Sequence, residues 1–161
     1  MFFSIAKINV FGVFKGHYGT LGYGRRKWVK FTDFILFYIL PFGIGLCYSI
    51  AQECDILMGI PAECWTAALT ITSIFTPLTL SLLTGLFSLR DDLSRNPRAI
   101  ILLREVTYNI CYVIVVALIL LCTVVTIRLV RAELSSTASG IFLVLLSHLM
   151  LTLLMVIMYL Q

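Results

Sequence analysis

Four long apolar stretches alternate with short charged segments along this chain. A helix that crosses a bilayer needs about 20 predominantly apolar residues. The stretches predict four transmembrane helices, over residues 34–51, 65–89, 106–127 and 138–160. We therefore expect an all-α membrane protein, in which residues 33–161 form one four-helix domain.

The second apolar stretch carries a regular series of hydroxyl side chains. Residues taken at alternating steps of four and three lie on one face of a helix. In this stretch the series consists of Thr66, Thr70, Ser73, Pro77, Ser81, Thr84 and Ser88. A shorter row, Thr72, Thr76 and Thr79, widens the polar face. We call the longer series the hydroxyl stripe, and it predicts a helix that is weakly polar along one whole side.

Three interpretations of the hydroxyl stripe are open. Small hydroxyl residues let membrane helices approach closely and hydrogen-bond, which is typical of a packing seam. Hydroxyls also solvate ions without fixing a charge, as in the wall of a water-filled pore. A substrate passage is the third interpretation. Pro77 lacks an amide hydrogen, so a kink is expected halfway along the stripe.

The third apolar stretch predicts an unusually long helix. After Asn96 and Pro97, a good helix start, no breaker follows before Ser135. A helix over residues 97–130 would be about 51 Å long, whereas the hydrocarbon core is about 30 Å thick. This helix should therefore project from the membrane. Asn109, just inside the stretch, is expected to hydrogen-bond a neighbouring helix.

Charge predicts how the chain is oriented. Of 161 residues, 60% are apolar and only 12% are charged, which excludes a soluble globule. Ten of the 12 basic residues precede the first stretch or separate the second from the third. The charged residues between the first and second stretches are all acidic: Glu53, Asp55 and Glu63. The positive-inside rule therefore places both termini in the cytoplasm.

Residues 1–32 form an amphipathic, basic arm before the first stretch. Residues 2–14 predict an amphipathic helix that lies on the inner leaflet or packs under the bundle. Four glycines are expected to break regular structure after it: Gly16, Gly19, Gly22 and Gly24. The basic cluster Arg25, Arg26 and Lys27 then reads as an interface anchor. A site for an anionic ligand, such as a nucleotide or a phospholipid, is the alternative.

Candidate catalytic groups are sparse. The two histidines are His17 in the arm and His148 near the middle of the fourth stretch. Metal-ligand and nucleophile–base motifs are absent from the sequence, so neither an enzyme nor a metal or cofactor site is expected. An ionisable residue at the depth of His148 indicates function by default. A neutral imidazole that hydrogen-bonds a threonine of the second stretch is the alternative.

The five cysteines fall into two groups. Three lie in apolar stretches and are expected to be inert packing residues. Cys54 and Cys64 flank the acidic segment between the first two stretches. A disulfide between them would need an oxidising compartment and a short separation, and the sequence leaves it open.

The arm and the start of the first stretch resemble a known family. The likeness is carried by Phe14-Lys15-Gly16-His17-Tyr18-Gly19-Thr20-Leu21, the basic cluster, and Asp33 entering an apolar run broken by Pro41. This arrangement is similar to small bacterial membrane effectors of anti-phage systems, such as the channel effector of the Hailong system. The resemblance implies a multi-pass protein of the bacterial inner membrane that forms a homo-oligomeric channel, expected as a tetramer.

The resemblance also implies how such a channel is controlled. A nucleotide or oligonucleotide messenger from a partner nucleotidyltransferase would bind cytoplasmic elements and open the channel, which would depolarise the infected cell. Lys15, His17 and Thr20 would contribute to that messenger site. Two alternatives stay open: a non-conducting scaffold that anchors a soluble partner through the arm, and a holin-like pore former. Because a four-helix protomer leaves no lumen, a pore lined by the stripe needs several copies.

Overall fold

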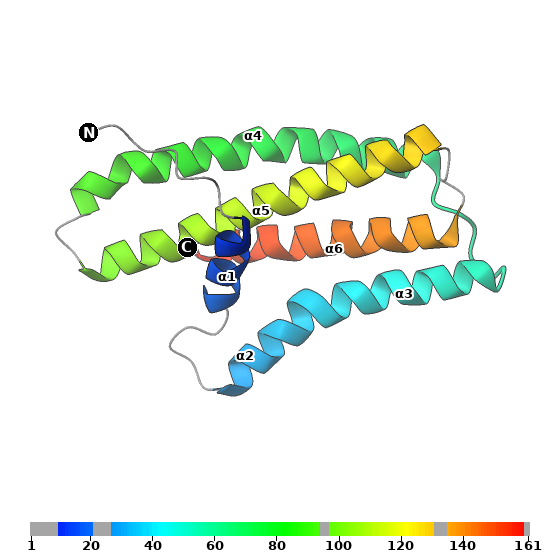
Figure 1. The fold of residues 1–161 in the computed structure, drawn as a ribbon, viewed down its shortest axis with the longest axis horizontal. Coiled ribbons are helices and arrows are strands. Elements are labelled where there is room, and N and C mark those ends of the chain that lie inside the picture. Colours follow the sequence, from blue (N-terminus) through cyan, green and yellow to red (C-terminus); the bar gives the residue numbers. More distant parts are fainter. Residues whose placement is uncertain (1–9, 21–26, 94–96, 131–134, 160–161) are drawn as a thin grey trace.

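The computed structural model describes residues 10–20, 27–93, 97–130 and 135–159. Every element in these ranges is helical (Figure 1). Four helices are long and apolar enough to cross a membrane: Phe31–Glu53, Ala62–Ser88, Ala99–Val130 and Ser136–Met158. The predicted all-α membrane fold with four spans is confirmed.

The four long helices lie side by side in the order α4, α5, α6, α3 (Figure 1). The first span is one continuous helical segment that contains a π-helical turn, η1. This segment runs through the predicted domain boundary at residues 32 and 33. The elements are α2 (Lys27–Phe34), η1 (Ile35–Ile39), α3 (Leu40–Glu53), α4 (Ala62–Leu93), α5 (Pro97–Val130) and α6 (Ser136–Tyr159).

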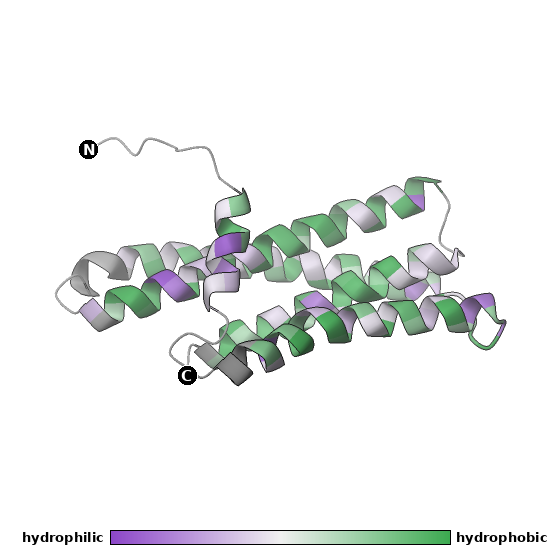
Figure 2. Cartoon of the chain, turned by 60° about the horizontal axis from the view of Figure 1, so that its bottom comes forward, coloured by the Kyte–Doolittle hydropathy of each residue, from purple (hydrophilic) through white to green (hydrophobic). Residues whose placement is uncertain are grey.

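This order leaves two helices at the edges of the protomer. α4 packs along α5, and α3 packs along α6 on the opposite side. Hydrophobic residues fill the middle of the long helices, whereas hydrophilic residues collect near their ends and on α1 (Figure 2). α5 has the predicted bounds, Pro97–Val130, and α4 continues through Pro77 without interruption.

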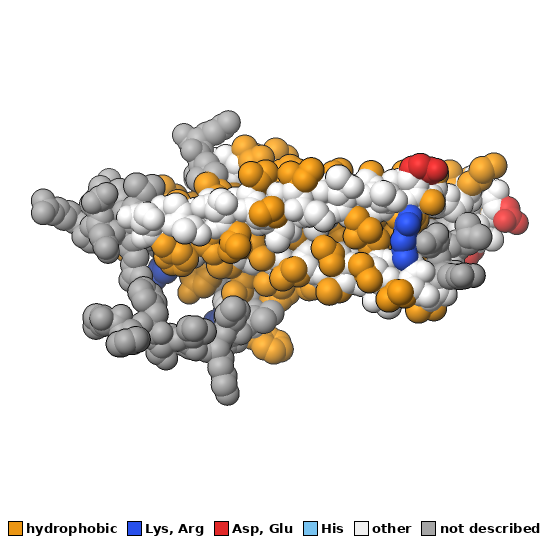
Figure 3. Space-filling model, turned by 90° about the horizontal axis from the view of Figure 1, so that it is seen from above, with side chains coloured by type: hydrophobic (Ala, Val, Ile, Leu, Met, Phe, Trp, Pro, Cys, Tyr) orange, Lys and Arg blue, Asp and Glu red, His pale blue; other side chains and the backbone are white. Residues whose placement is uncertain are grey.

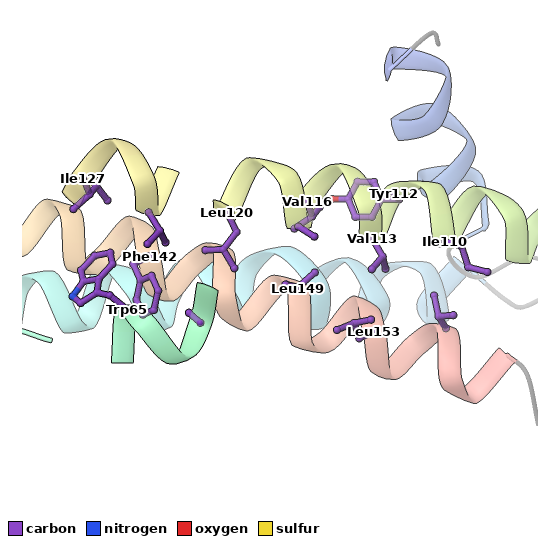
Figure 4. Close-up of a cluster of buried hydrophobic side chains, with 14 of the residues drawn as sticks. Trp65, Ile110, Tyr112, Val113, Val116, Leu120, Ile127, Phe142, Leu149 and Leu153 are labelled. Carbon is purple, nitrogen blue, oxygen red and sulfur yellow. The ribbon is translucent and has the colours of Figure 1, made fainter. Parts of the chain in front are cut away.

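The core lies between α4, α5 and α6 (Figure 4). Trp65 is fully buried, its ring 4.3 Å from that of Phe142, and its indole nitrogen donates to the Ile60 carbonyl at 3.2 Å. Further along, Leu120 of α5 and Leu149 of α6 are buried in the same cluster. Since acyl chains are as apolar as these side chains, close packing holds the helices together.

Two glycines let α3 and α6 approach closely. A Cβ atom added to Gly45 would lie 2.5 Å from the Gly140 carbonyl oxygen, so one of the two helices would have to shift. Beside this contact, the Ser49 hydroxyl donates to the Ser136 carbonyl at 2.9 Å. Small residues thus allow the close packing of α3 against α6.

The described part of the arm forms α1 (Val10–Thr20), which lies across α5 (Figure 1). Gly16 and Gly19 are inside this helix, so the prediction that they break regular structure is wrong. Gly22 and Gly24 lie outside the described residues. A Cβ on Gly16 would lie 2.5 Å from the ring of Tyr108, whereas one on Gly19 would meet nothing within 4 Å. Gly16 therefore allows α1 to approach α5.

The structure also answers the open question of a disulfide in the segment that joins α3 to α4. Cys54 and Cys64 are both free thiols, and both are exposed.

Candidate functional site

The hydroxyl stripe is exposed along its whole length. All seven of its residues, from Thr66 to Ser88, are exposed in the protomer. Figure 3 shows polar and backbone surface running as a pale row along the molecule, with hydrophobic side chains on both sides. Phe75, Leu78 and Phe87 are among the exposed hydrophobic residues of the same helix. The stripe therefore does not pack within its own protomer.

The shorter hydroxyl row is the one that faces inward. Thr72 and Thr79 are buried, with 1% and 6% of their surface exposed, and Thr76 is half-buried. This row lies on the side of α4 that packs along α5. These threonines, and not the stripe, lie in the contact between α4 and α5. The stripe is therefore available for another contact.

The stripe presents hydrogen-bond acceptors rather than donors. Five of its hydroxyls donate to the carbonyl four residues earlier in α4, at distances of 2.7 to 3.2 Å. Their protons are thus used within the helix, and lone pairs remain on the exposed side. Pro77 has no amide hydrogen to give to the Ser73 carbonyl, which adds a backbone acceptor near the middle.

A cationic side chain already lies against one end of the stripe. A guanidinium nitrogen of Arg128, near the end of α5, donates to the Ala62 carbonyl at 2.8 Å. The same nitrogen is 3.3 Å from the Thr66 hydroxyl oxygen. This contact illustrates that a positively charged group finds acceptors on this face of α4.

A second polar group is buried where α1 meets the spans. We call His17, Thr20, Asn109, Tyr112 and His148 the polar cluster. His17 Nδ1 lies 2.9 Å from the Asn109 side-chain oxygen, and the Thr20 hydroxyl donates to the same oxygen at 2.8 Å. The His17 ring stacks on Tyr112, with ring centres 3.8 Å apart. These contacts hold α1 on α5, and they confirm that Asn109 hydrogen-bonds a neighbouring helix.

His148 continues the cluster into the first span. Its Nδ1 lies 2.6 Å from the Phe37 carbonyl oxygen, and its Nε2 lies 2.7 Å from the Tyr112 hydroxyl. A carbonyl can only accept, so Nδ1 carries the proton, and Nε2 of the neutral ring accepts from Tyr112. Pro41, four residues after Phe37, has no amide hydrogen, which leaves that carbonyl for the imidazole.

The predicted partner of His148 is therefore wrong. His148 bonds Tyr112 of α5 and the backbone of the first span, and not a threonine of α4. Its position inside the bundle is as predicted, since only 9% of its surface is exposed.

His17 is neutral in this environment. Burial lowers its pKa from the ordinary 6.5 to about 4, although the hydrogen bond to Asn109 opposes that effect. Within the described part of the chain, His17 Nε2 and Asn109 Nδ2 are buried without a hydrogen-bond partner. A proton taken up by this ring would therefore put a charge into a buried contact, which is unfavourable.

Among the residues predicted to bind an anionic ligand, the three on α1 do not share one surface. Lys15 is exposed on α1, whereas His17 and Thr20 are buried in the polar cluster. Arg25 and Arg26 lie outside the described residues, and Lys27 is placed only as the first residue of α2. In this conformation His17 and Thr20 hydrogen-bond Asn109 and hold α1 on α5.

The described residues contain no group of three or more His, Cys, Asp or Glu side chains that could hold a metal ion. No family model, no curated protein and no solved structure matches the chain.

Proposed function

We propose that this protein is a homo-oligomeric membrane channel in which several copies turn the hydroxyl stripe of α4 toward a shared aqueous path. The observation that carries the proposal is the exposure of the stripe on an edge helix. Acyl chains offer no hydrogen bonds, so polar side chains in spans usually face a bundle interior or water. Assembly around the stripe would provide that environment.

The length of the stripe fits a continuous path. Thr66 and Ser88 are 22 residues apart in α4, which corresponds to about 33 Å of helix. The hydrocarbon core is about 30 Å thick. A stripe that served only a local contact would not need to cross the whole bilayer.

The chemistry of the stripe favours cations. Hydroxyl and carbonyl oxygens replace the water around a cation, as the oxygens of ion-selective pores do. The exposed side of α4 offers such oxygens at successive turns, while the hydroxyl protons are used within the helix. We therefore assign cations, rather than anions, as the conducted species.

The biological role rests on the resemblance of residues 14–41 to anti-phage channel effectors. On that basis we propose a tetramer in a bacterial inner membrane, with both termini in the cytoplasm. A nucleotide or oligonucleotide messenger made by a neighbouring nucleotidyltransferase would open it and depolarise the cell.

Ion flux from liposomes tests the proposal. Potassium release should be lost in the Thr70→Leu and Thr84→Leu variants, because each places an alkyl group in the path. Thr126→Leu is the matched control, since Thr126 is an exposed threonine of α5 outside the stripe. Expression should be toxic for the wild type and for the control only.

Three results would count against the proposal. Unaltered flux in both stripe variants would exclude α4 as the pore helix. A monomer in lipid would exclude a shared path, and would favour the scaffold. Release of proteins along with ions would indicate a holin-like lesion instead.

A further inference from the structure

Tyr112 of α5 is in contact with both the arm and α6. Its ring packs against two rings of α1: the His17 ring stacks on it with ring centres 3.8 Å apart, and the Phe14 ring meets it edge-on at 5.2 Å. Figure 4 shows Tyr112 on α5, next to α1. The Tyr112 hydroxyl donates to His148 Nε2 of α6 at 2.7 Å. One side chain therefore joins the position of α1 to that of the imidazole.

His148 extends this contact to the π-helical turn of the first span. Its Nδ1 donates to the Phe37 carbonyl oxygen at 2.6 Å, and Phe37 lies in the middle of η1. That carbonyl receives no hydrogen bond from Pro41, which has no amide hydrogen. π-Helical turns are rare and are found frequently at functional sites. The imidazole thus supports the irregular turn, and Tyr112 supports the imidazole.

Space is available beside these contacts. A cavity of about 470 Å³ is lined by Tyr38 of the first span, Tyr112 and His148, among others. Protein interiors are close-packed and hold few voids larger than a water molecule. A Tyr112 side chain that loses its stack on His17 therefore has a second position to turn into.

α1 can leave α5 while the spans stay packed. It has 11 residues and is not one of the four spans. Within the described part of the chain, His17 Nε2 and Asn109 Nδ2 are buried in its contact without a hydrogen-bond partner. Such atoms cost free energy, which offsets part of what the hydrogen bonds to Asn109 contribute.

We propose that α1 is a strap whose position controls the conformation of the first span. With α1 docked, His17 and Phe14 hold Tyr112 against His148, and His148 holds the Phe37 carbonyl. When α1 leaves, Tyr112 turns toward the cavity, its bond to His148 breaks, and the π-helical turn loses its support. Such coupling needs a continuous chain of packed and hydrogen-bonded groups that has two arrangements. The chain lies away from the hydroxyl stripe, so the proposal does not depend on ion conduction.

A variant that releases α1 tests the coupling. Gly16→Leu puts a side chain where an added Cβ already lies 2.5 Å from the Tyr108 ring. Hydrogen exchange in lipid nanodiscs should become about tenfold faster for the amides of α1 and of residues 35–40, and should not change for residues 66–88. Gly19→Leu is the matched control, because a Cβ there meets nothing within 4 Å. It should leave the exchange of residues 35–40 unchanged.

A second variant tests whether the coupling passes through the Tyr112 hydroxyl. Tyr112→Phe keeps the ring that His17 stacks on but removes the donor to His148. Residues 35–40 should exchange faster in this variant, while the amides of α1 should not. Adding Gly16→Leu should then accelerate α1 without a further change at residues 35–40, which is the non-additivity expected of residues that act in one chain.

Four results would overturn the proposal. They are unchanged exchange of α1 in Gly16→Leu, faster exchange of α1 with no change at residues 35–40, equal acceleration of all four spans, and a further acceleration of residues 35–40 when Gly16→Leu is added to Tyr112→Phe. Because no ion flux is measured, failure of the channel proposal would leave this result intact.

Discussion

The hydroxyl stripe and the polar cluster are two solutions to the same problem, a polar side chain in an apolar helix. Stripe hydroxyls such as Thr70 and Thr84 bond the carbonyl one turn back on their own helix and stay exposed. Cluster residues such as Asn109 and His148 bond other helices and are buried. The stripe is satisfied locally, whereas the cluster is satisfied only by the tertiary structure.

This difference separates what the two regions can do. Removing a stripe hydroxyl such as that of Thr70 or Thr84 deprives no group on another helix of its partner, so the protomer should keep its stability. Removing a cluster residue leaves a buried donor or acceptor on another helix, which costs about 1–3 kcal/mol for each group. The cluster therefore holds the protomer together, and the stripe is free to serve assembly or conduction.

The largest loss of stability is expected for His148→Leu. The substitution leaves both the Phe37 carbonyl and the Tyr112 hydroxyl without the partner they have in the structure. Two such groups should lower the free energy of unfolding by about 4 kcal/mol, measured by reversible unfolding in lipid or detergent.

Ser147→Ala is the matched control for that variant. Its hydroxyl bonds the Leu143 carbonyl at 2.6 Å on its own helix, so its loss should change the free energy by less than about 0.5 kcal/mol. Equal effects of the two substitutions would abolish the distinction between local and tertiary satisfaction.

Acid should weaken the docking of α1 by up to about 3 kcal/mol. His17 has a pKa of about 4 when docked and an ordinary value near 6.5 when released. The released arm therefore binds a proton first, and the free energy of docking falls as the pH drops from 6.5 to 4. Above pH 6.5 docking should not vary with the charge of this ring.

Hydrogen exchange of the α1 amides, corrected for the intrinsic effect of pH, measures this docking. Protection should decline between pH 6.5 and 4 in the wild type. His17→Gln should show a flat profile over that range, and a matching decline in this variant would assign the effect to another group.

Asn109→Leu should have an intermediate effect, of about 2 kcal/mol. Leucine has a similar shape but accepts no hydrogen bond, so the His17 Nδ1 proton loses its acceptor. The Thr20 hydroxyl keeps its second contact, to the His17 carbonyl at 2.6 Å. Faster exchange confined to α1 is the expected result, and Thr84→Leu on the stripe should show no change. Faster exchange throughout the four spans would mean that Asn109 supports the whole bundle.

The elements that sequence predicts well are those fixed by local pattern. The four spans follow from the length of apolar runs, and α5 begins at Pro97 because Asn96-Pro97 starts a helix and no breaker follows. The stripe likewise follows from helical periodicity, which places its residues on one face. Periodicity does not say which way that face turns, because the answer depends on α4 packing along α5 by its other side.

The elements that sequence predicts poorly are those decided by contacts far along the chain. Glycine disfavours a helix by about 1 kcal/mol per residue, yet α1 includes Gly16 because the Tyr108 ring occupies the place of a side chain. The partners of His148 depend on a carbonyl that Pro41 leaves unpaired, 111 residues away in sequence at Phe37. Each outcome needs the order of the helices, which no local pattern contains.

The smallest effect, about 1 kcal/mol, is expected from a methyl group on α1. Gly16→Ala places a Cβ 2.5 Å from the ring of Tyr108, so the ring or the helix must shift and the cluster contacts of His17 weaken. Gly19→Ala adds the same methyl to the same helix where nothing lies within 4 Å, and its better helix propensity should stabilise α1. Exchange of the α1 amides should therefore become faster in the first variant and slower in the second. If both variants became slower, helix propensity alone would set the stability of α1, and the polar cluster would not be what holds it on α5.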